Sequence, residues 1–273
     1  MSNMKKVGLQ LYTLRDYFNS NDEALNTLKR VRNIGYKTVQ LHISSIAPHD
    51  MKNMLDEAGL SVCGMDASLN RMRYDLDAVL EECRLFGCKY ITDSYEGDGN
   101  VFADGYDGYF QIINGYEKGI NQFTEIISDI GDRLKGSGCY FAYHNHSFEM
   151  IRKDGKTMLD TFYDNTKDYG ILAEIDTYWI QHGGADPASL IEQYQNRVPI
   201  IHLKDMEVEI VNGQTNQLFS EVGNGNMNWK RIIQSAEKAG VEWYVVEQDK
   251  CNKDPFLSVQ ESYDYLKTLL TNE

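Results

Sequence analysis

The chain has 273 residues, of which 42% are hydrophobic and 25% charged, and its formal net charge is −14. These proportions are ordinary for a soluble globular protein, and the length suits a barrel of strand–helix units. The strong negative charge argues against nucleic acid and against an anionic membrane surface as the main partner, because both are themselves negative.

Targeting and redox features are also informative. No apolar run approaches the roughly 20 residues of a membrane span, and the N-terminal segment has no apolar stretch of the kind found in signal peptides. The five cysteines form no CxxC pair, which favours a reduced setting. We therefore expect a cytoplasmic protein that binds neither membrane nor nucleic acid.

Eight short apolar or β-branched runs recur along the chain, and most are followed by a helical pattern. The runs cover residues 6–12, 38–42, 61–65, 89–93, 139–144, 170–176, 199–204 and 243–248. Strand followed by helix, repeated eight times, predicts a parallel sheet. With eight strands the natural closure is a single (β/α)8 TIM barrel, and we expect it to form one domain over residues 1–273.

The helices between these runs carry recognisable boundaries. One run spaces its apolar residues at helical intervals, namely Leu25, Leu28, Val31 and Ile34. Gly35 is expected to end that helix, and Asp186 followed by Pro187 is a strong start signal for a later one. An open doubly wound sheet is the alternative fold, although no glycine-rich phosphate loop follows the first run.

Residues 94–116 interrupt this regular pattern. The segment is rich in Gly, Tyr and Asp and is longer than a usual strand–helix connection. Long connections of this kind often form lids or walls of substrate sites. A surface excursion or an oligomer contact is the alternative.

Polar residues occur repeatedly where the predicted strands end, which in such a barrel is the catalytic face. They are Gln10, Tyr12, Gln40, His42, His144, Asp176, His202 and Glu247. Because side chains alternate along a strand, Glu174 shares a side with Asp176, and Lys204 shares a side with His202. We expect the last four strand-end residues, from His144 to Glu247, to converge in the barrel mouth.

Two carboxylates and two imidazoles from neighbouring strands would make a mixed nitrogen and oxygen site. Such a site suits Mn²⁺, Co²⁺, Zn²⁺ or Fe²⁺ better than Ca²⁺. A single histidine at a strand end is more often a hydrogen-bonding group than a ligand. Four such residues at the ends of successive strands favour a metal site.

The segment Tyr143–Glu149, "YHNHSFE", is unusually crowded with polar groups. It contains a formal glycosylation sequon at Asn145, which has no meaning without secretion, and the letters of a nuclease motif, which the acidic charge disfavours. His144 and His146 also resemble the HxH pair of amidohydrolase-type hydrolases. Those enzymes carry the pair on the first strand, whereas here it follows the fifth.

Six segments together resemble one known family. They are "GLQLYTLRD", "YHNHSFE", "EIDTYW", "IIHLKD", "EVGNGNMNW" and "VVEQD", and they resemble the xylose isomerase-like TIM-barrel superfamily, which includes ketose 3-epimerases and inosose dehydratase. The resemblance extends over almost the whole chain. It implies a (β/α)8 barrel, one catalytic divalent cation and a small polyhydroxylated substrate. Mn²⁺ is the expected ion, with Co²⁺, Zn²⁺, Fe²⁺ and Mg²⁺ as alternatives.

Matched onto this sequence, the family pattern implies Asp176, His202 and Glu247 as three of four metal ligands. The ketose epimerases have a glutamate as the fourth, at the end of strand five, where this chain has His144. Glu149, five residues later, is the alternative fourth ligand. Trp179 stands where the epimerases carry a histidine.

The resemblance implies chemistry in which a base removes a proton next to a carbonyl. Glu247 is the expected base, and the opposite proton carrier would be His144, Glu149, Lys204 or His146. This makes an isomerase or epimerase of a small sugar, keto-sugar or sugar phosphate the first interpretation. A lyase acting on a keto-sugar or keto-inositol, and a non-catalytic sugar-binding barrel, are the alternatives.

The remaining candidates concern the substrate. Lys204 would hold a phosphate or carboxylate, donate a proton, or simply pair with Asp205. Trp179 and Tyr12 would provide apolar faces for a sugar, or pack at the rim of the barrel. The expected substrate-binding residues are Gln10, Tyr12, His42, His146 and Trp179, and the family is compatible with a homodimer or homotetramer.

Overall fold

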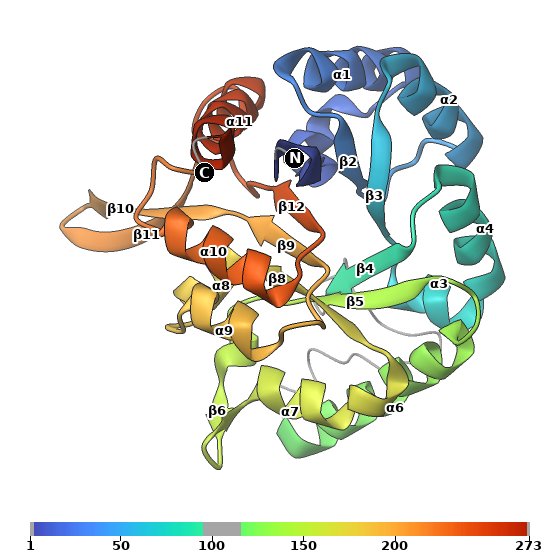
Figure 1. Ribbon diagram of the computed structural model, residues 1–273, viewed down its shortest axis with the longest axis vertical. Helices are drawn as coiled ribbons and strands as arrows, with labels where there is room; N and C mark the ends of the chain where they lie inside the picture. Colours follow the sequence, from blue (N-terminus) through green and yellow to red (C-terminus); the bar gives the residue numbers. More distant parts are fainter. Residues whose placement is uncertain (1–2, 95–115, 272–273) are drawn as a thin grey trace.

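The computed structural model describes residues 3–94 and 116–271, and its centre is a closed barrel of eight parallel strands (Figure 1). Around the barrel the strands pair in the order β1–β12–β9–β8–β5–β4–β3–β2. Their bounds are β1 Val7–Gln10, β2 Thr38–Leu41, β3 Ser61–Asp66, β4 Tyr90–Ser94, β5 Tyr140–His144, β8 Leu172–Asp176, β9 Ile200–Leu203 and β12 Trp243–Val246. Every one overlaps a predicted run, so the (β/α)8 prediction is confirmed and the open sheet is wrong.

Helices surround the barrel (Figure 1). The α-helices are α1 Asn21–Ile34, α2 Pro48–Ala58, α3 Leu69–Tyr74, α4 Leu76–Phe86, α6 Tyr116–Leu134, α7 Met158–Asn165, α8 Thr177–His182, α9 Pro187–Gln193, α10 Trp229–Ala239 and α11 Pro255–Thr271. Short 3₁₀ segments are η1 Asn3–Lys6, η2 Leu11–Tyr17, η3 Phe148–Met150 and η4 Lys167–Tyr169. The predicted boundaries hold, since α1 ends before Gly35, whose φ is 131°, and the Asp186 side chain caps α9.

Two hairpins outside the barrel were not predicted from the sequence. They are β6 Arg152–Lys153 with β7 Lys156–Thr157, and β10 Asp205–Val211 with β11 Gln214–Ser220. The second turns at Asn212 and Gly213, whose φ values of 52° and 77° fit a tight hairpin turn. That Asn-Gly pair, which follows a stretch with Val208, Ile210 and Val211, was the available signal.

The barrel interior is apolar near its lower end and polar near its mouth. A small buried cluster fills the lower part with Cys63, Tyr90, Ile200 and Val245. Two residues above Ile200 on β9 lies His202, which pairs in register with Asp176 of β8. Because side chains alternate along a strand, Ile200 and His202 both point into the barrel, the first in its apolar lower part and the second at its polar mouth.

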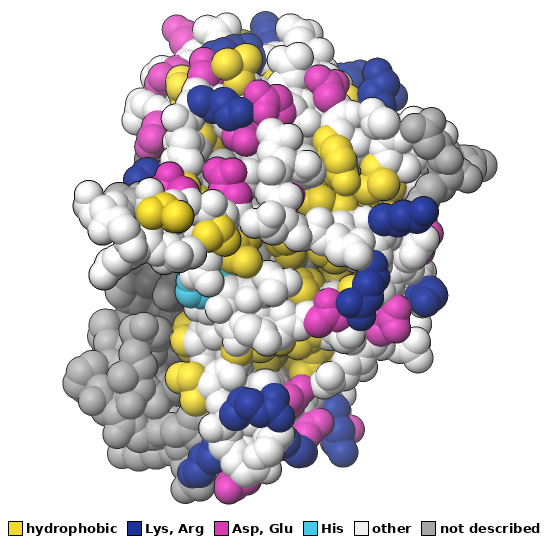
Figure 2. Space-filling view, turned by 90° about the vertical axis from the view of Figure 1, so that its left-hand side faces the viewer, with side chains coloured by type: hydrophobic (Ala, Val, Ile, Leu, Met, Phe, Trp, Pro, Cys, Tyr) yellow, Lys and Arg dark blue, Asp and Glu magenta, His cyan; other side chains and the backbone are white. Residues whose placement is uncertain are grey.

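The outer surface carries both signs of charge. Figure 2 shows lysines, arginines and acidic side chains interspersed on one face.

The C-terminal helix α11 contacts η1, so the two ends of the described chain lie on the same side of the barrel (Figure 1). Within residues 3–94 and 116–271, no helix has the length and apolar character needed to cross a membrane. The predicted lid at 94–116 falls, apart from its two end residues, outside the described residues.

Candidate active site

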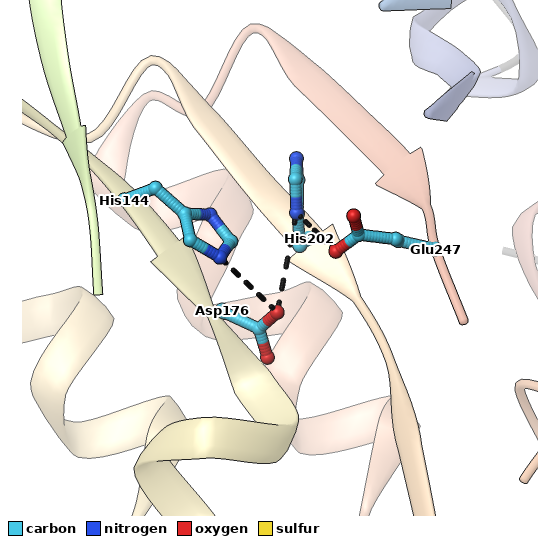
Figure 3. Close-up of side chains that lie close together, drawn as sticks. All are labelled: His144, Asp176, His202 and Glu247. Atoms are coloured by element: carbon cyan, nitrogen blue, oxygen red, sulfur yellow. Dashed lines mark hydrogen bonds and ion pairs between the residues drawn. The ribbon is translucent and has the colours of Figure 1, made fainter. Parts of the chain in front are cut away.

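Four side chains meet at the mouth of the barrel, as Figure 3 shows. His144 ends β5, Asp176 ends β8, His202 lies on β9, and Glu247 directly follows β12. Each offers one nitrogen or oxygen, and these four atoms all lie within 4.8 Å of one another. Three of the residues are buried, while the side chain of His144 is 11% exposed. The structure therefore brings together the four residues that the strand-end pattern selected.

The position of Asp176 is set by its neighbours. Its backbone N–H donates to Oδ1 of Asn145 at 3.1 Å, and its own Oδ1 accepts from the backbone N–H of Trp179 at 3.1 Å as the N-cap of α8. The other oxygen, Oδ2, lies 3.8 Å from His144 Nε2 and 3.9 Å from His202 Nδ1. One oxygen thus starts a helix, while the other faces both imidazoles.

Lys204 lies beside this group with its side chain 1% exposed. Its ammonium is 2.8 Å from Asp176 Oδ2, 2.7 Å from Glu247 Oε2 and 2.6 Å from Asp249 Oδ1. Burial opposes the charge, but the three carboxylates outweigh it and hold the pKa of Lys204 well above its usual range. The alternative of a surface pair with Asp205 is wrong, because Asp205 is engaged elsewhere.

These residues fit a divalent cation. Asp176 Oδ2 is buried and makes no hydrogen bond to any described residue, since its contact with Lys204 is an ion pair outside hydrogen-bond geometry. Two imidazole nitrogens and two carboxylate oxygens are a donor set that transition metals accept. Donor atoms that each lie about 2.0–2.3 Å from one ion are at most about 4.6 Å apart. The four atoms here all lie within 4.8 Å of one another, so small side-chain shifts would let them share an ion.

The electrostatics of the group are strongly coupled. Burial would raise the pKa of the Glu247 carboxyl, but Lys204 and His202 outweigh burial and lower it well below its usual range. Conversely, burial would lower the pKa of His202, but neighbouring carboxylates raise it well above 6.5. In the metal-free protein Glu247 is therefore ionised, and the 2.7 Å contact between its Oε2 and His202 Nδ1 is charge-assisted.

Glu149, the alternative fourth ligand, lies apart from this group. Its Oε1 accepts from the hydroxyl of Tyr143 at 2.7 Å, and its Oε2 accepts from the backbone N–H of His146 at 2.9 Å. Burial outweighs these contacts and raises the pKa of Glu149 to about 7. The geometry thus favours His144 over Glu149 as fourth ligand.

A pocket of about 470 Å³ opens above the four residues. All five predicted substrate-binding residues line it, namely Gln10, Tyr12, His42, His146 and Trp179. The ring centroids of Tyr12 and His42 are 4.7 Å apart, and those of His146 and Trp179 are 5.3 Å apart. Aromatic faces thus stand on two sides of the pocket, which suits the C–H faces of a sugar.

A comparison with protein families agrees with this geometry. The model of the xylose isomerase-like TIM barrel family matches residues 28–269. The chain belongs to this family. Among curated proteins it is 25% identical over 151 residues to inosose dehydratase of Lacticaseibacillus casei, a match that covers 50% of each chain. The chain thus aligns with about half the length of that relative.

Solved structures show the same fold as this xylose isomerase-like barrel. A sugar phosphate isomerase/epimerase from Parabacteroides distasonis aligns with a TM-score of 0.75 and 22% identity, covering 97% of this chain and 96% of that one. L-ribulose 3-epimerase aligns with a TM-score of 0.70 and 11% identity, covering 97% and 94%. A family member from Mycobacterium smegmatis in complex with magnesium aligns with a TM-score of 0.67 and 12% identity, covering 98% and 97%.

Several residues that line the pocket of the present chain were given no role in the sequence analysis. Asp66, at the end of β3, accepts from Gln10, Thr92 and Gln40 and contacts Nδ1 of His42 at 3.2 Å. Three more acidic residues that line the pocket had no predicted role, namely Asp93, Glu174 and Asp249. Asp66 and Asp93 lie at strand ends, so the rule that found Asp176 would have found them as well.

Proposed function

We propose that this protein is a metal-dependent isomerase or epimerase of a small sugar or keto-sugar. The observation that carries the proposal is the convergence of His144, Asp176, His202 and Glu247 beside a pocket of about 470 Å³. A divalent cation held by these residues, Mn²⁺ in the first place, would polarise a substrate carbonyl and acidify the neighbouring C–H. The chain's own residues would then move the proton.

Glu247 is the proposed base. One of its oxygens accepts a hydrogen bond from His202 and forms an ion pair with Lys204, and the other is turned away from His202 (Figure 3). Its low pKa keeps it ionised, so it is ready to accept a proton without first losing one. Its weak basicity has to be offset by the acidity that the substrate C–H gains in the site.

Epimerisation requires a second proton carrier on the opposite face of the substrate carbon, and we assign this role to His146, which lines the pocket. Burial, together with the nearby His144 and Lys204, lowers the pKa of His146 well below 6.5. His146 is therefore neutral at pH 7 and able to accept a proton. Lys204 stays an ammonium, which suits it to stabilise a developing negative oxygen or to donate a proton.

The charge of the pocket supports an uncharged sugar rather than a sugar phosphate. Its lining carries the carboxylates Asp66, Asp93, Glu174, Glu247 and Asp249. Lys204 is the one lysine or arginine among the described lining residues, and three carboxylates already hold it. Arg15 lies near the rim, where its guanidinium donates to the carbonyls of Tyr12 and Asp249. The described lining residues therefore offer no lysine or arginine that is free to bind a phosphate group.

The test is exchange of a substrate C–H for deuterium in D₂O, measured by NMR for ketoses, ketose phosphates and keto-inositols. The Mn²⁺-loaded wild type should catalyse exchange, with the unphosphorylated compounds ahead of the phosphates. Glu247→Gln keeps an oxygen for the metal but removes the base, so exchange should fall by about 10²-fold or more. Exchange that survives unchanged in Glu247→Gln would remove this residue from the role and point to His146, His144 or Lys204.

A lyase is the second candidate, because the curated relatives include inosose dehydratase. The same proton abstraction, followed by loss of a β-hydroxyl, would release water. Mass spectrometry of the reaction separates the two candidates, since an isomer keeps the substrate mass and a dehydration product does not. Absence of any exchange by the metal-loaded protein would favour the non-catalytic sugar-binding barrel.

A further inference from the structure

Glu174 is a buried carboxylate directly behind the two candidate histidine ligands. It lies on β8 two residues before Asp176 and is 1% exposed. Its Oε1 lies 3.0 Å from His144 Nδ1 and 3.3 Å from His202 Nε2. These are the ring nitrogens opposite those that face Asp176 Oδ2.

Gln40 of β2 completes the contacts of this carboxylate. Its amide Nε2 donates to Glu174 Oε2 at 2.7 Å, and its Oε1 lies 3.0 Å from His202 Nε2. The reverse amide orientation would place the Gln40 oxygen against the Glu174 carboxylate, where neither group can donate. With the amide fixed in this way, both neighbours of His202 Nε2 are acceptors, so Nε2 must carry a hydrogen.

We propose that Glu174 is a positioning residue that selects which imidazole nitrogens of His144 and His202 bind the cation. A carboxylate only accepts hydrogen bonds, so His144 donates through Nδ1 and His202 donates through Nε2. This leaves Nε2 of His144 and Nδ1 of His202 for the ion. Those two atoms lie 3.8 Å and 3.9 Å from Asp176 Oδ2, on the side of the candidate site.

The two histidines thus use opposite ring nitrogens because one carboxylate lies between them. Hydrogen bonds of this kind hold a ligating ring in one orientation and one tautomer, and losing them typically weakens metal affinity by about 10- to 100-fold. Glu174 would act on the ion through the histidines, without binding the ion itself. The inference rests on the proposed metal site, but its tests read binding rather than turnover.

The first test needs no variant. Long-range ¹H–¹⁵N NMR of the Zn²⁺-loaded wild type, labelled at histidine nitrogens, reports which nitrogen of each ring carries hydrogen and which binds metal. We expect a protonated Nδ1 on His144 and a protonated Nε2 on His202. The same protonated nitrogen on both rings, or either assignment reversed, would overturn the inference. If Zn²⁺ does not bind, this inference and the proposed function both fail.

The second test is the Mn²⁺ affinity of Glu174→Gln, measured by an EPR titration of free Mn²⁺. An amide in this position turns a donor toward the two histidines or toward Gln40. If the Gln40 amide turns over to accept, its own NH₂ then faces His202 Nε2. Each arrangement sets a donor against a donor, so affinity should fall by about 10- to 100-fold. Glu149→Gln is the matched control, because it also replaces a buried carboxylate but contacts neither imidazole ring. At pH 8, where Glu149 is largely ionised, the control should keep wild-type affinity.

The outcomes separate the two proposals. Wild-type affinity in a folded Glu174→Gln, checked by its melting temperature, would overturn the positioning role and leave the proposed function standing. Equal weakening in Glu174→Gln and Glu149→Gln would mean that lost negative charge, rather than orientation of the rings, sets the affinity, and would also overturn it.

Discussion

The crowded segment Tyr143–Glu149 places each of its polar residues in a different contact. His144 faces the candidate metal site, and Asn145 holds the backbone of Asp176. His146 lines the pocket beside Trp179. Glu149 accepts hydrogen bonds from the hydroxyl of Tyr143 and the backbone N–H of His146, so it links the end of the segment to its beginning and middle. The carboxylate that the sequence offered as a ligand is thus a structural group.

Glu149 gives a prediction for the pH dependence of stability. Its pKa is raised to about 7 in the folded state, whereas an unfolded glutamate titrates near 4.3. Between these values the folded protein binds one more proton than the unfolded chain, so stability falls as pH rises, by up to about 1.4 kcal/mol per pH unit. Glu149→Gln does not titrate, and its amide can still accept from His146 and donate to Tyr143.

Urea unfolding of both proteins at pH 5, 6 and 7, and again at pH 8 and 9, checks this prediction. The stability of Glu149→Gln relative to the wild type should rise steadily from pH 5 to pH 7 and level off above pH 7. A constant difference between the two proteins would mean that Glu149 titrates at its ordinary value in the fold.

At the scale of elements, Asp205 organises the connection between β11 and α10. It accepts hydrogen bonds of 2.5 Å to 3.2 Å from the indole of Trp229 and from the backbone N–H groups of Met206, Gly223, Gly225 and Met227. A Cβ on Gly225 would clash with the Asp205 carboxylate and with the carbonyl of Met206. The glycines of "EVGNGNMNW" thus let the backbone wrap around one carboxylate.

We predict that Asp205→Ala destabilises the protein by at least about 3 kcal/mol, because it leaves several buried donors without an acceptor. Asn224→Ala in the same connection should cost less than about 1 kcal/mol, because Asn224 makes an exposed bond to Glu261. Chemical denaturation measures both. Similar losses for the two variants would show that Asp205 is no more important than its neighbours.

For the whole molecule, a cation that bridges four strands should stabilise the closed barrel. Ligand linkage predicts about 2.7 kcal/mol when free metal exceeds its dissociation constant by about 100-fold. For a chain of this length that corresponds to a rise in melting temperature of roughly 5 °C. Scanning calorimetry with Mn²⁺ and with a chelator measures the shift.

Asp176→Ala and His202→Ala should abolish this metal-dependent shift and lose bound metal in elemental analysis. A shift that persists in both variants would place the stabilising ion elsewhere in the molecule.

The expected homodimer or homotetramer and the cytoplasmic location stay predictions, and sedimentation analysis of the purified protein tests the oligomeric state.

The sequence by itself determined the architecture and the position of the site. Alternating strands and helices predict a barrel, because buried parallel strands need apolar residues and their ends do not. A His, Asp or Glu that ends such a strand therefore marks the open face, and the period of two correctly placed Asp176 and His202 on the inside. The caps at Gly35 and Asp186 were predictable because each depends on residues next to it in the chain.

The tertiary structure decided the contacts between residues that are far apart in the chain. The partners of Lys204 come from β8 and from the segment after β12, and those of Glu174 come from β2, β5 and β9. No local pattern fixes such contacts, because they depend on the register and closure of the whole barrel. For the same reason the choice between His144 and Glu149 was open in the sequence, since both are near the end of β5 and only the fold shows which one turns toward Asp176.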